Sequence, residues 1–258
     1  MPYSNSMLSK NQIKFINSLK QKKFRQENRL FISEGNKIVS ELLESEIKIK
    51  QVVATTDFFN KTKINNGIEC IEINSREMER VSALTTPTEV LAVCEIPDYK
   101  LNTDELKDKL TLVLDDIKDP GNLGTIIRIA DWFGISNIIC SNNTADVFNP
   151  KVVQATMGSI SRVKVHYKEL PELFQISDFK FQIYGALLEG ENIYSHKLSS
   201  QGLIIIGNES KGISENLLPY ITNKVSIPSF SHLKQGGETE SLNAAIATAI
   251  ICSEFRRR

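Results

Sequence analysis

The sequence predicts an α/β fold, with a mainly parallel sheet covered by helices in its second part and a smaller α/β unit before it. Two observations support this fold class. Short apolar runs alternate with helical stretches along the 258-residue chain, and strands that alternate with helices pair in parallel beneath helices on both faces. The stretch from Pro97 to Leu110 is polar and charged. Residues 98–109 are therefore predicted to link a first domain (residues 1–97) to a second (residues 110–258).

The first domain is predicted to begin with a helix over residues 9–23, because Ile13, Ile16 and Leu19 recur at three-residue intervals and form one apolar stripe. Shorter apolar runs then alternate with helical stretches. They predict strands at residues 30–32, 49–54, 70–73 and 90–95, and helices at residues 37–43 and 75–84.

The second domain opens with an apolar run at residues 110–114, which is typical of a buried strand. A helix is predicted at residues 123–133 and a second strand at residues 137–140. Further strands are predicted at residues 181–186, 203–206 and 224–227, before a closing helix at residues 241–255.

The composition argues against several classes of protein. No stretch approaches the ~20 consecutive apolar residues of a membrane-spanning helix, so no membrane partner is expected. The N-terminus lacks the basic-then-apolar pattern expected of a signal peptide. The four cysteines lie far apart without a Cys-x-x-Cys pair, which argues against a zinc site and for reduced thiols in a cytoplasmic protein.

Basic side chains concentrate near the N-terminus, although the chain as a whole is balanced, with 31 basic and 31 acidic residues. Residues 1–30 contain seven lysines and arginines and a single acid, and such a patch can contact phosphate groups. The candidates for such contacts are Lys20, Lys22, Lys23 and Arg25. The alternative is a solvated helix face.

The first candidate motif follows the strand at residues 110–114 and opens the next helix. Its polar loop includes Gly121 and Asn122 and lies at the carboxyl end of a buried strand, where open α/β sheets bind their ligands. Arg128 follows on the helix between two isoleucines. An ordinary connecting loop in which Asn122 caps the helix is the alternative. A nicotinamide site is disfavoured because Gly121 and Gly124 lack the full G-x-G-x-x-G spacing.

Two further strands end in a similar way. The strand at residues 203–206 runs into Gly207-Asn208-Glu209-Ser210-Lys211-Gly212, which places an acid between glycines. The strand at residues 224–227 runs into a polar loop, after which Ser241-Leu242-Asn243 opens the last helix. Ser241 as a helix cap is the simplest alternative there, whereas Asn243 has less structural reason to stand in the first turn of a helix.

Together these motifs resemble those of the SpoU (TrmH-type) class of SPOUT RNA methyltransferases. The first family motif is matched from Asn122 to Arg128 and the second from Gly207 to Gly212, while Ile227-Pro228 and Ser241-Leu242-Asn243 match the third. The first domain is similar to the L30e-like substrate-binding domain that often precedes this catalytic domain, so the resemblance covers nearly the whole chain. The segments that carry this second resemblance are Lys23-Phe24-Arg25, Leu30-Phe31 and Glu34-Gly35.

The resemblance implies a deep trefoil knot near the C-terminus, a homodimer whose active site draws on both subunits, and no metal. It also implies that S-adenosylmethionine is the cofactor and is held largely by backbone groups. Carried over by motif, the cofactor-binding residues are Leu187, Gly207, Ile227 and Leu242. The catalytic residues are Asn122, Arg128, Glu209, Ser241 and Asn243.

The implied reaction is attack of a ribose 2′-oxygen on a sulfonium methyl group, which requires alignment of two atoms and removal of a proton from a poor acid. The family assigns Arg128 to that hydroxyl. Because a guanidinium keeps its proton, Arg128 is expected to orient the hydroxyl and stabilise negative charge, with Glu209 holding it. Two departures concern the third motif: Ser229 stands where a methionine is common, and the loop from Pro228 to Ser241 is longer than usual.

Three alternatives bear on the function. A non-catalytic RNA-binding protein of the same fold is disfavoured because Arg128 and Asn243 are present. A base methyltransferase is disfavoured because the S-L-N motif belongs to the ribose-modifying branch. Ribosomal RNA is favoured over transfer RNA as the substrate, because an L30e-like domain suits folded ribosomal RNA. The predicted RNA contacts are then Lys20, Lys22, Lys23 and Arg25.

Overall fold

The computed structural model describes residues 8–176, 182–230 and 241–257. The chain forms two compact units. Unit 1 comprises Met1–Asp98 together with Asp146–Arg162, and unit 2 comprises Tyr99–Ala145 together with Val163–Arg258. Residues 146–162 thus belong to unit 1 rather than to the second domain predicted from the sequence. As a result the chain passes between the units three times, after residues 98, 145 and 162.

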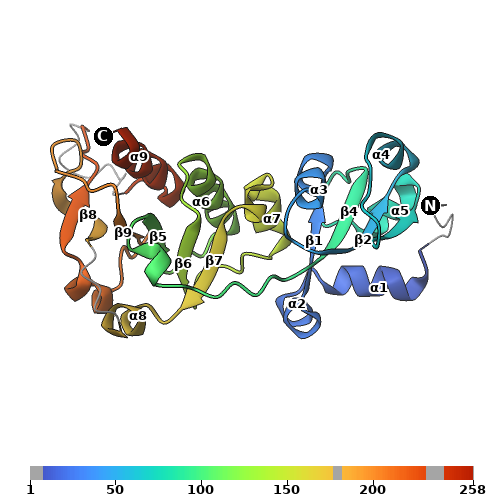
Figure 1. Cartoon of the computed structure of the whole chain (residues 1–258), viewed down its shortest axis with the longest axis horizontal. Coiled ribbons are helices and arrows are strands. Elements are labelled where there is room, and N and C mark those ends of the chain that lie inside the picture. Colours follow the sequence, from blue (N-terminus) through green and yellow to red (C-terminus); the bar gives the residue numbers. More distant parts are fainter. Residues whose placement is uncertain (1–7, 177–181, 231–240, 258) are drawn as a thin grey trace. The chain divides into compact units, whose positions relative to one another are not determined.

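Unit 1 is built on a four-stranded sheet with the order β1-β4-β2-β3 (Figure 1). β4 pairs antiparallel with both β1 and β2, whereas β2 and β3 are parallel. All four strands correspond to strands predicted from the sequence. They are β1 (Leu30–Glu34), β2 (Ile49–Ala54), β3 (Glu69–Glu72) and β4 (Val90–Glu95).

Helices cover both faces of this sheet. Alternate residues of a strand face opposite sides, so Ile32 joins the core beneath the first and fifth helices while Phe31 packs against Phe148, with 4.8 Å between ring centroids. The helices of unit 1 are α1 (Lys10–Ser18), α2 (Lys22–Asn28), α3 (Asn36–Leu43), α4 (Thr56–Lys61), α5 (Ser75–Val81), α7 (Pro150–Thr156) and the 3-10 turn η2 (Ser159–Ser161).

The single helix predicted over residues 9–23 is two helices in the structure, because α1 ends at Ser18 and α2 begins at Lys22. The carbonyls of Leu19 and Lys20 lie at the break, where a helix end leaves its carbonyls without intrahelical partners. Both accept hydrogen bonds from the Arg25 guanidinium, at 3.0 and 2.8 Å. A side chain from the second helix therefore stabilises the break.

Unit 2 is built on a six-stranded sheet with the order β10-β8-β9-β5-β6-β7, and every neighbouring pair is parallel. The mainly parallel sheet predicted from the sequence is confirmed. The edge strand β7 was not predicted, because Lys-Val-His-Tyr-Lys has little apolar character. The strands are β5 (Leu110–Leu114), β6 (Asn137–Ser141), β7 (Lys164–Lys168), β8 (Ile183–Asn192), β9 (Gly202–Ile206) and β10 (Asn223–Ser226).

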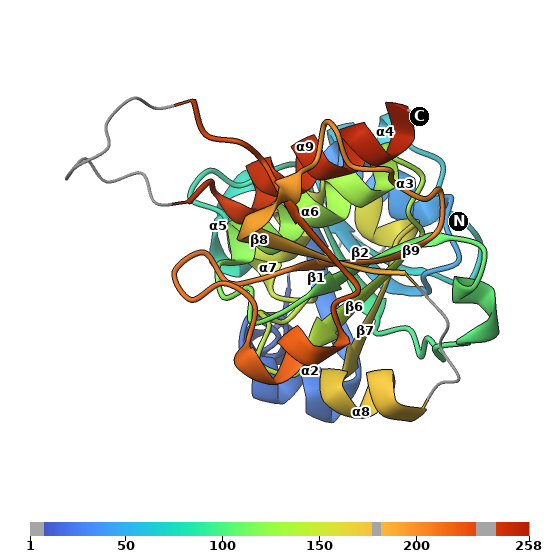
Figure 2. The same cartoon turned by 90° about the vertical axis from the view of Figure 1, so that its left-hand side faces the viewer.

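In unit 2, α6 (Pro120–Trp132) and α9 (Ala244–Arg257) lie side by side on one face of the sheet, while α8 (Leu170–Ile176) covers the other (Figures 1 and 2). The 3-10 turns η1 (Asp104–Leu106) and η3 (Glu215–Tyr220) contribute to the core beneath α8. No helix among the described residues is long and apolar enough to cross a membrane. The knot stays a prediction, and residues 231–240, between β10 and α9, lie outside the described part of the chain.

Candidate active site

The first motif is placed by the N-terminus of α6. Asp119 caps this helix by accepting a hydrogen bond from the Asn122 amide N–H at 2.7 Å, and Pro120 occupies the first turn, where its missing N–H costs nothing. Asn122 is thus a first-turn residue and not the helix cap. Because β5 and β9 are paired neighbours, this turn lies beside the Gly207–Gly212 loop that follows β9.

Four of the five predicted catalytic residues are joined by hydrogen bonds. Asn122 Nδ2 donates to Glu209 Oε1 at 2.5 Å, and Asn243 Nδ2 donates to Asn122 Oδ1 at 2.9 Å. Ser241 Oγ donates to the backbone carbonyl of Glu209 at 3.1 Å. Residues up to 121 positions apart in the chain therefore form one polar cluster at the carboxyl edge of the sheet.

Asn243 also has a structural role. Its Oδ1 accepts hydrogen bonds from the amide N–H groups of Ala245 and Ile246 at 3.0 and 3.3 Å, so it caps α9. The alternative in which Ser241 caps this helix is wrong, because the Ser241 hydroxyl donates to the backbone carbonyl of Glu209. The cap directs the Asn243 amide nitrogen towards Asn122.

Arg128 stands apart from this cluster. It is exposed and makes no hydrogen bond or ion pair with any residue that the structure describes, so the expected pairing with Glu209 is absent within the chain. The reason is helical geometry: six residues separate Asn122 from Arg128, which places the two side chains about 120° apart around α6. Arg128 instead shares an exposed stripe with Trp132, one turn further on.

Three of the four predicted cofactor-binding residues lie in or directly after the adjacent strands β10, β8 and β9, and the fourth precedes α9. Leu187, in the middle of β8 and two residues beyond its last pair with β9, and Ile227, after β10, are half-buried, and Leu242, before α9, is 42% exposed. Gly207, after β9, packs so closely that an added Cβ would lie 2.3 Å from the carbonyl carbon of Gly212. Partly exposed apolar side chains such as these are typical of the lining of a small-molecule site.

The β8–β10 pairing is interrupted beside this edge. The register passes from Gly185 opposite Lys224 to Glu191 opposite Val225, so residues 186–190 leave the ladder. This irregularity releases Leu187 from the ladder.

The sequence departs from the family pattern at Ser229 and in the long loop from Pro228 to Ser241. Residues 231–240 of that loop lie outside the described residues. Within the part that is described, no group of three or more histidines, cysteines and acids could hold a metal ion.

The predicted RNA contacts in unit 1 separate into three kinds. Lys22 and Lys23 are exposed. Lys20 is half-buried and donates to the Ser82 carbonyl at 2.7 Å, and burial lowers its pKa despite the opposing effect of Glu34.

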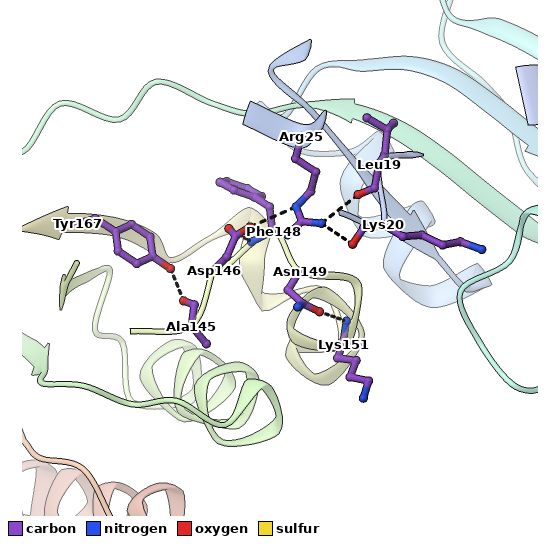
Figure 3. A network of polar contacts seen from close by, with 9 residues as sticks. All are labelled: Leu19, Lys20, Arg25, Ala145, Asp146, Phe148, Asn149, Lys151 and Tyr167. Carbon is purple, nitrogen blue, oxygen red and sulfur yellow. Dashed lines mark hydrogen bonds and ion pairs between the residues drawn. The ribbon is translucent and has the colours of Figure 1, made fainter. Parts of the chain in front are cut away.

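Arg25 is a correction, because its side chain is only 2% exposed and cannot contact RNA. Figure 3 shows its guanidinium between the Leu19 and Lys20 carbonyls and the Asp146 carboxylate, with 2.6 Å between Nη2 and Oδ2 of that ion pair. All of its partners lie in unit 1. The positive charge of Arg25 is therefore paired within unit 1.

Comparison with known proteins identifies the family of the chain. Residues 109–253 match the model of the SpoU rRNA Methylase family, and residues 10–92 match that of the MRM3-like substrate binding domain. The chain is 31% identical to the 23S rRNA (guanosine(2553)-2′-O)-methyltransferase RlmP of Bacillus subtilis, over 96% of this chain and 97% of that protein.

Two solved structures are similar over almost the whole chain. A TrmH-family protein from Porphyromonas gingivalis has a TM-score of 0.88 at 38% identity, covering 98% of this chain and all of that one. The AdoMet-bound rRNA methyltransferase from Sinorhizobium meliloti has a TM-score of 0.83 at 31% identity, covering 99% and 97%. The fold, the strand-end motifs and these matches together show that the chain belongs to the SpoU rRNA methylase family.

Proposed function

We propose that this protein transfers a methyl group from S-adenosylmethionine to a ribose 2′-hydroxyl of large-subunit ribosomal RNA. The observation that carries the proposal is the cluster of Asn122, Glu209 and Asn243 beside the apolar strand ends. Two relatives support the substrate class: RlmP and a 23S rRNA (uridine(2479)-2′-O)-methyltransferase of Streptomyces viridochromogenes, which is 31% identical over 67% of this chain. The four free cysteines suit the reducing cytoplasm.

S-adenosylmethionine supplies a methyl group that is already activated on a positively charged sulfur. The chain then has to place one hydroxyl and manage one proton. Asn122 and Asn243 offer amide groups whose mutual hydrogen bond fixes their orientation, and Glu209 is held at Oε1 by Asn122. Glu209 Oε2, which has no hydrogen-bond partner among the described residues, is assigned to orient the ribose. The proton passes to a substrate phosphate or to water.

The outer surface of α6 and α9 supports a homodimer. Trp132, at the end of α6, is 84% exposed and Ile246, near the start of α9, is 54% exposed, and large apolar side chains that are exposed often mark an interface. α6 and α9 run in the same direction, because Asn243 bonds Asn122 at one end and Arg256 Nε donates to the Phe133 carbonyl at the other, at 2.8 Å. A second copy of the chain bound to this surface would contact Arg128. We therefore assign Arg128 to the ribose bound in the active site of the partner subunit.

The decisive experiment measures transfer of labelled methyl from S-adenosylmethionine to in vitro transcripts of 23S ribosomal RNA and of transfer RNA. Digestion to nucleosides then distinguishes ribose from base methylation. We expect label on a ribose of the 23S transcript. Label confined to a base, or to transfer RNA, would contradict the proposal, as would a folded dimer that binds S-adenosylmethionine but transfers no label to either RNA.

A further inference from the structure

The turn that carries Glu209 is closed by a single neighbouring residue. Asn208 Oδ1 accepts hydrogen bonds from the backbone amides of Ser210 and Lys211, at 2.9 and 3.1 Å. The backbone of Asn208 also exchanges two hydrogen bonds with Gly212, at 3.0 and 2.9 Å. The shape of the turn is therefore set by Asn208 and backbone groups, without help from the Glu209 side chain.

The same side chain reaches the end of the neighbouring strand. Asn208 Nδ2 donates to the backbone carbonyl of Asp116 at 2.9 Å. Asp116 has a φ of 60°, a left-handed conformation that residues other than glycine rarely adopt. Its own amide N–H donates to Ser141 Oγ at 2.9 Å. An unfavourable backbone conformation that is held on both sides is typical of a functional site.

A second bond joins the same two loops. Asp115, only 5% exposed, accepts a hydrogen bond from the Ser214 amide N–H at its Oδ2, at 2.7 Å. The loops after β5 and β9 are thus joined at two points by bonds to backbone groups, and the contact of Asn122 with Glu209 is a third. The bonds to the Asp116 carbonyl and to the Ser214 amide hold the two loops at a fixed distance, and Asn122 and Glu209 meet across it.

We propose that Asn208 is a positioning residue for methyl transfer. The hydrogen bond from its side-chain amide to the Asp116 carbonyl holds the Gly207–Gly212 turn in place and so positions Glu209 beside Asn122. The inference rests on the proposed function, because it gives Glu209 a role at the ribose. Catalytic groups must be held to within a fraction of an ångström by neighbours that do not react, and a misplacement of about 1 Å costs on the order of a hundredfold in rate.

The first test replaces the donor and keeps the acceptor. In Asn208→Asp, a carboxylate still accepts from the Ser210 and Lys211 amides but repels the Asp116 carbonyl. In Asn208→Ser, a hydroxyl still serves the turn but is too short to reach Asp116. We expect both variants to lose about tenfold or more in single-turnover rate, with a smaller change in S-adenosylmethionine affinity. A wild-type rate in both folded variants would overturn the proposal.

A matched control makes the same chemical change elsewhere. Asn65 Nδ2 donates to the Leu43 carbonyl at 3.1 Å, in an exposed part of unit 1. Asn65→Asp therefore breaks an amide-to-carbonyl bond of the same kind and should leave the rate unchanged.

A double-mutant cycle separates positioning from general support of the fold. If Asn208 acts through Glu209, then Asn208→Ser should cost little further rate in a Glu209→Gln background, because the group it positions is already gone. An equal loss in both backgrounds would show that Asn208 does not act through Glu209. Single-turnover measurements keep the slow variants measurable.

A readout independent of activity keeps this inference distinct from the proposed function. Amide hydrogen exchange should quicken over residues 207–214 in Asn208→Ser, while exchange over the strands of unit 2 stays as in the wild type. Unchanged exchange over residues 207–214 would contradict the positioning role of Asn208, whatever the activity of the variant. If exchange is faster but the wild-type protein methylates no RNA, the structural role of Asn208 stands and the proposed function is contradicted.

Discussion

The strand-end loops of unit 2 and the basic N-terminal segment of unit 1 were both singled out by sequence, and they differ in how their residues are used. In unit 2, Asn122, Glu209 and Asn243 come together from three separate motifs. In unit 1, neighbouring basic residues have unrelated roles, since Arg25 is buried while Lys22 is exposed. Residues that follow parallel strands lie close together in space, because the carboxyl ends of those strands share one edge of the sheet. A count of basic residues in a segment does not show which of them are exposed.

The largest expected effect concerns Arg128, the motif residue that the structure leaves outside the cluster. Arg128→Ala should lose methyl transfer by about a hundredfold or more, the range seen when a charge-stabilising group is removed. Arg128→Lys should also fail, because an ammonium lacks the planar fork of guanidinium donors. The assay is transfer of labelled methyl at saturating S-adenosylmethionine, with dimerisation followed by light scattering. A folded Arg128→Ala dimer that methylates at the wild-type rate would remove Arg128 from the active site.

Arg25 gives the sharpest contrast in unit 1. Arg25→Met should lower the free energy of unfolding by about 2 kcal/mol, because Asp146 and two carbonyls lose their donor; the figure is reduced from that of a fully buried pair since Asp146 is 17% exposed. Urea unfolding measures the change, and exposed Arg29, replaced in the same way, is the control. The salt dependence of RNA binding should be unaltered in Arg25→Met, and a flatter dependence would restore Arg25 to the RNA contacts.

The exposed lysines should behave in the opposite way. Replacing Lys22 and Lys23 by alanine should reduce the slope of log affinity against log salt by about one to two, because each phosphate contact releases about one counterion. Stability should change little, since the Lys23–Glu27 ion pair, 3.9 Å long, is exposed. Fluorescence anisotropy of labelled RNA at several salt concentrations measures the slope. An unchanged slope would identify these lysines as a solvated helix face.

The smallest expected effect is the pH dependence of stability that His166 in unit 2 contributes. Burial lowers the pKa of His166 below its ordinary value, and Lys168 and Lys164 add to this effect, while a hydrogen bond with the Tyr99 backbone and the charge of Glu105 oppose it. The folded protein therefore binds fewer protons than the unfolded chain below about pH 6.5, and stability falls as the pH drops through the lowered pKa. Thermal midpoints between pH 5 and 7.5 should show this slope, and His166→Leu should flatten it. An equal slope in both proteins would contradict the assignment.

The parts of the molecule that could be predicted from sequence are those encoded locally. All strands except β7 follow from apolar runs, and the members of the polar cluster were found in motifs that follow β5, β9 and β10 along the chain. The burial of Arg25 could not be predicted, because its carboxylate partner lies 121 positions away. Nor could the absence of an Arg128–Glu209 pair, since it depends on the Gly207–Gly212 loop meeting α6 at Asn122, which no local pattern specifies. The placement of residues 146–162 in unit 1 depends on packing against β1, which no local pattern reveals.

The three passages of the chain between the units bear on how the protein is made. Domains usually fold in order as they leave the ribosome, but unit 1 lacks α7 and the carboxylate of Asp146 until residue 162 has been synthesised. By then β5, α6 and β6 of unit 2 have already been synthesised. The two units must therefore mature in overlapping stages during translation. For the same reason, a chimera that exchanges the N-terminal unit between relatives has to carry residues 146–162 with it.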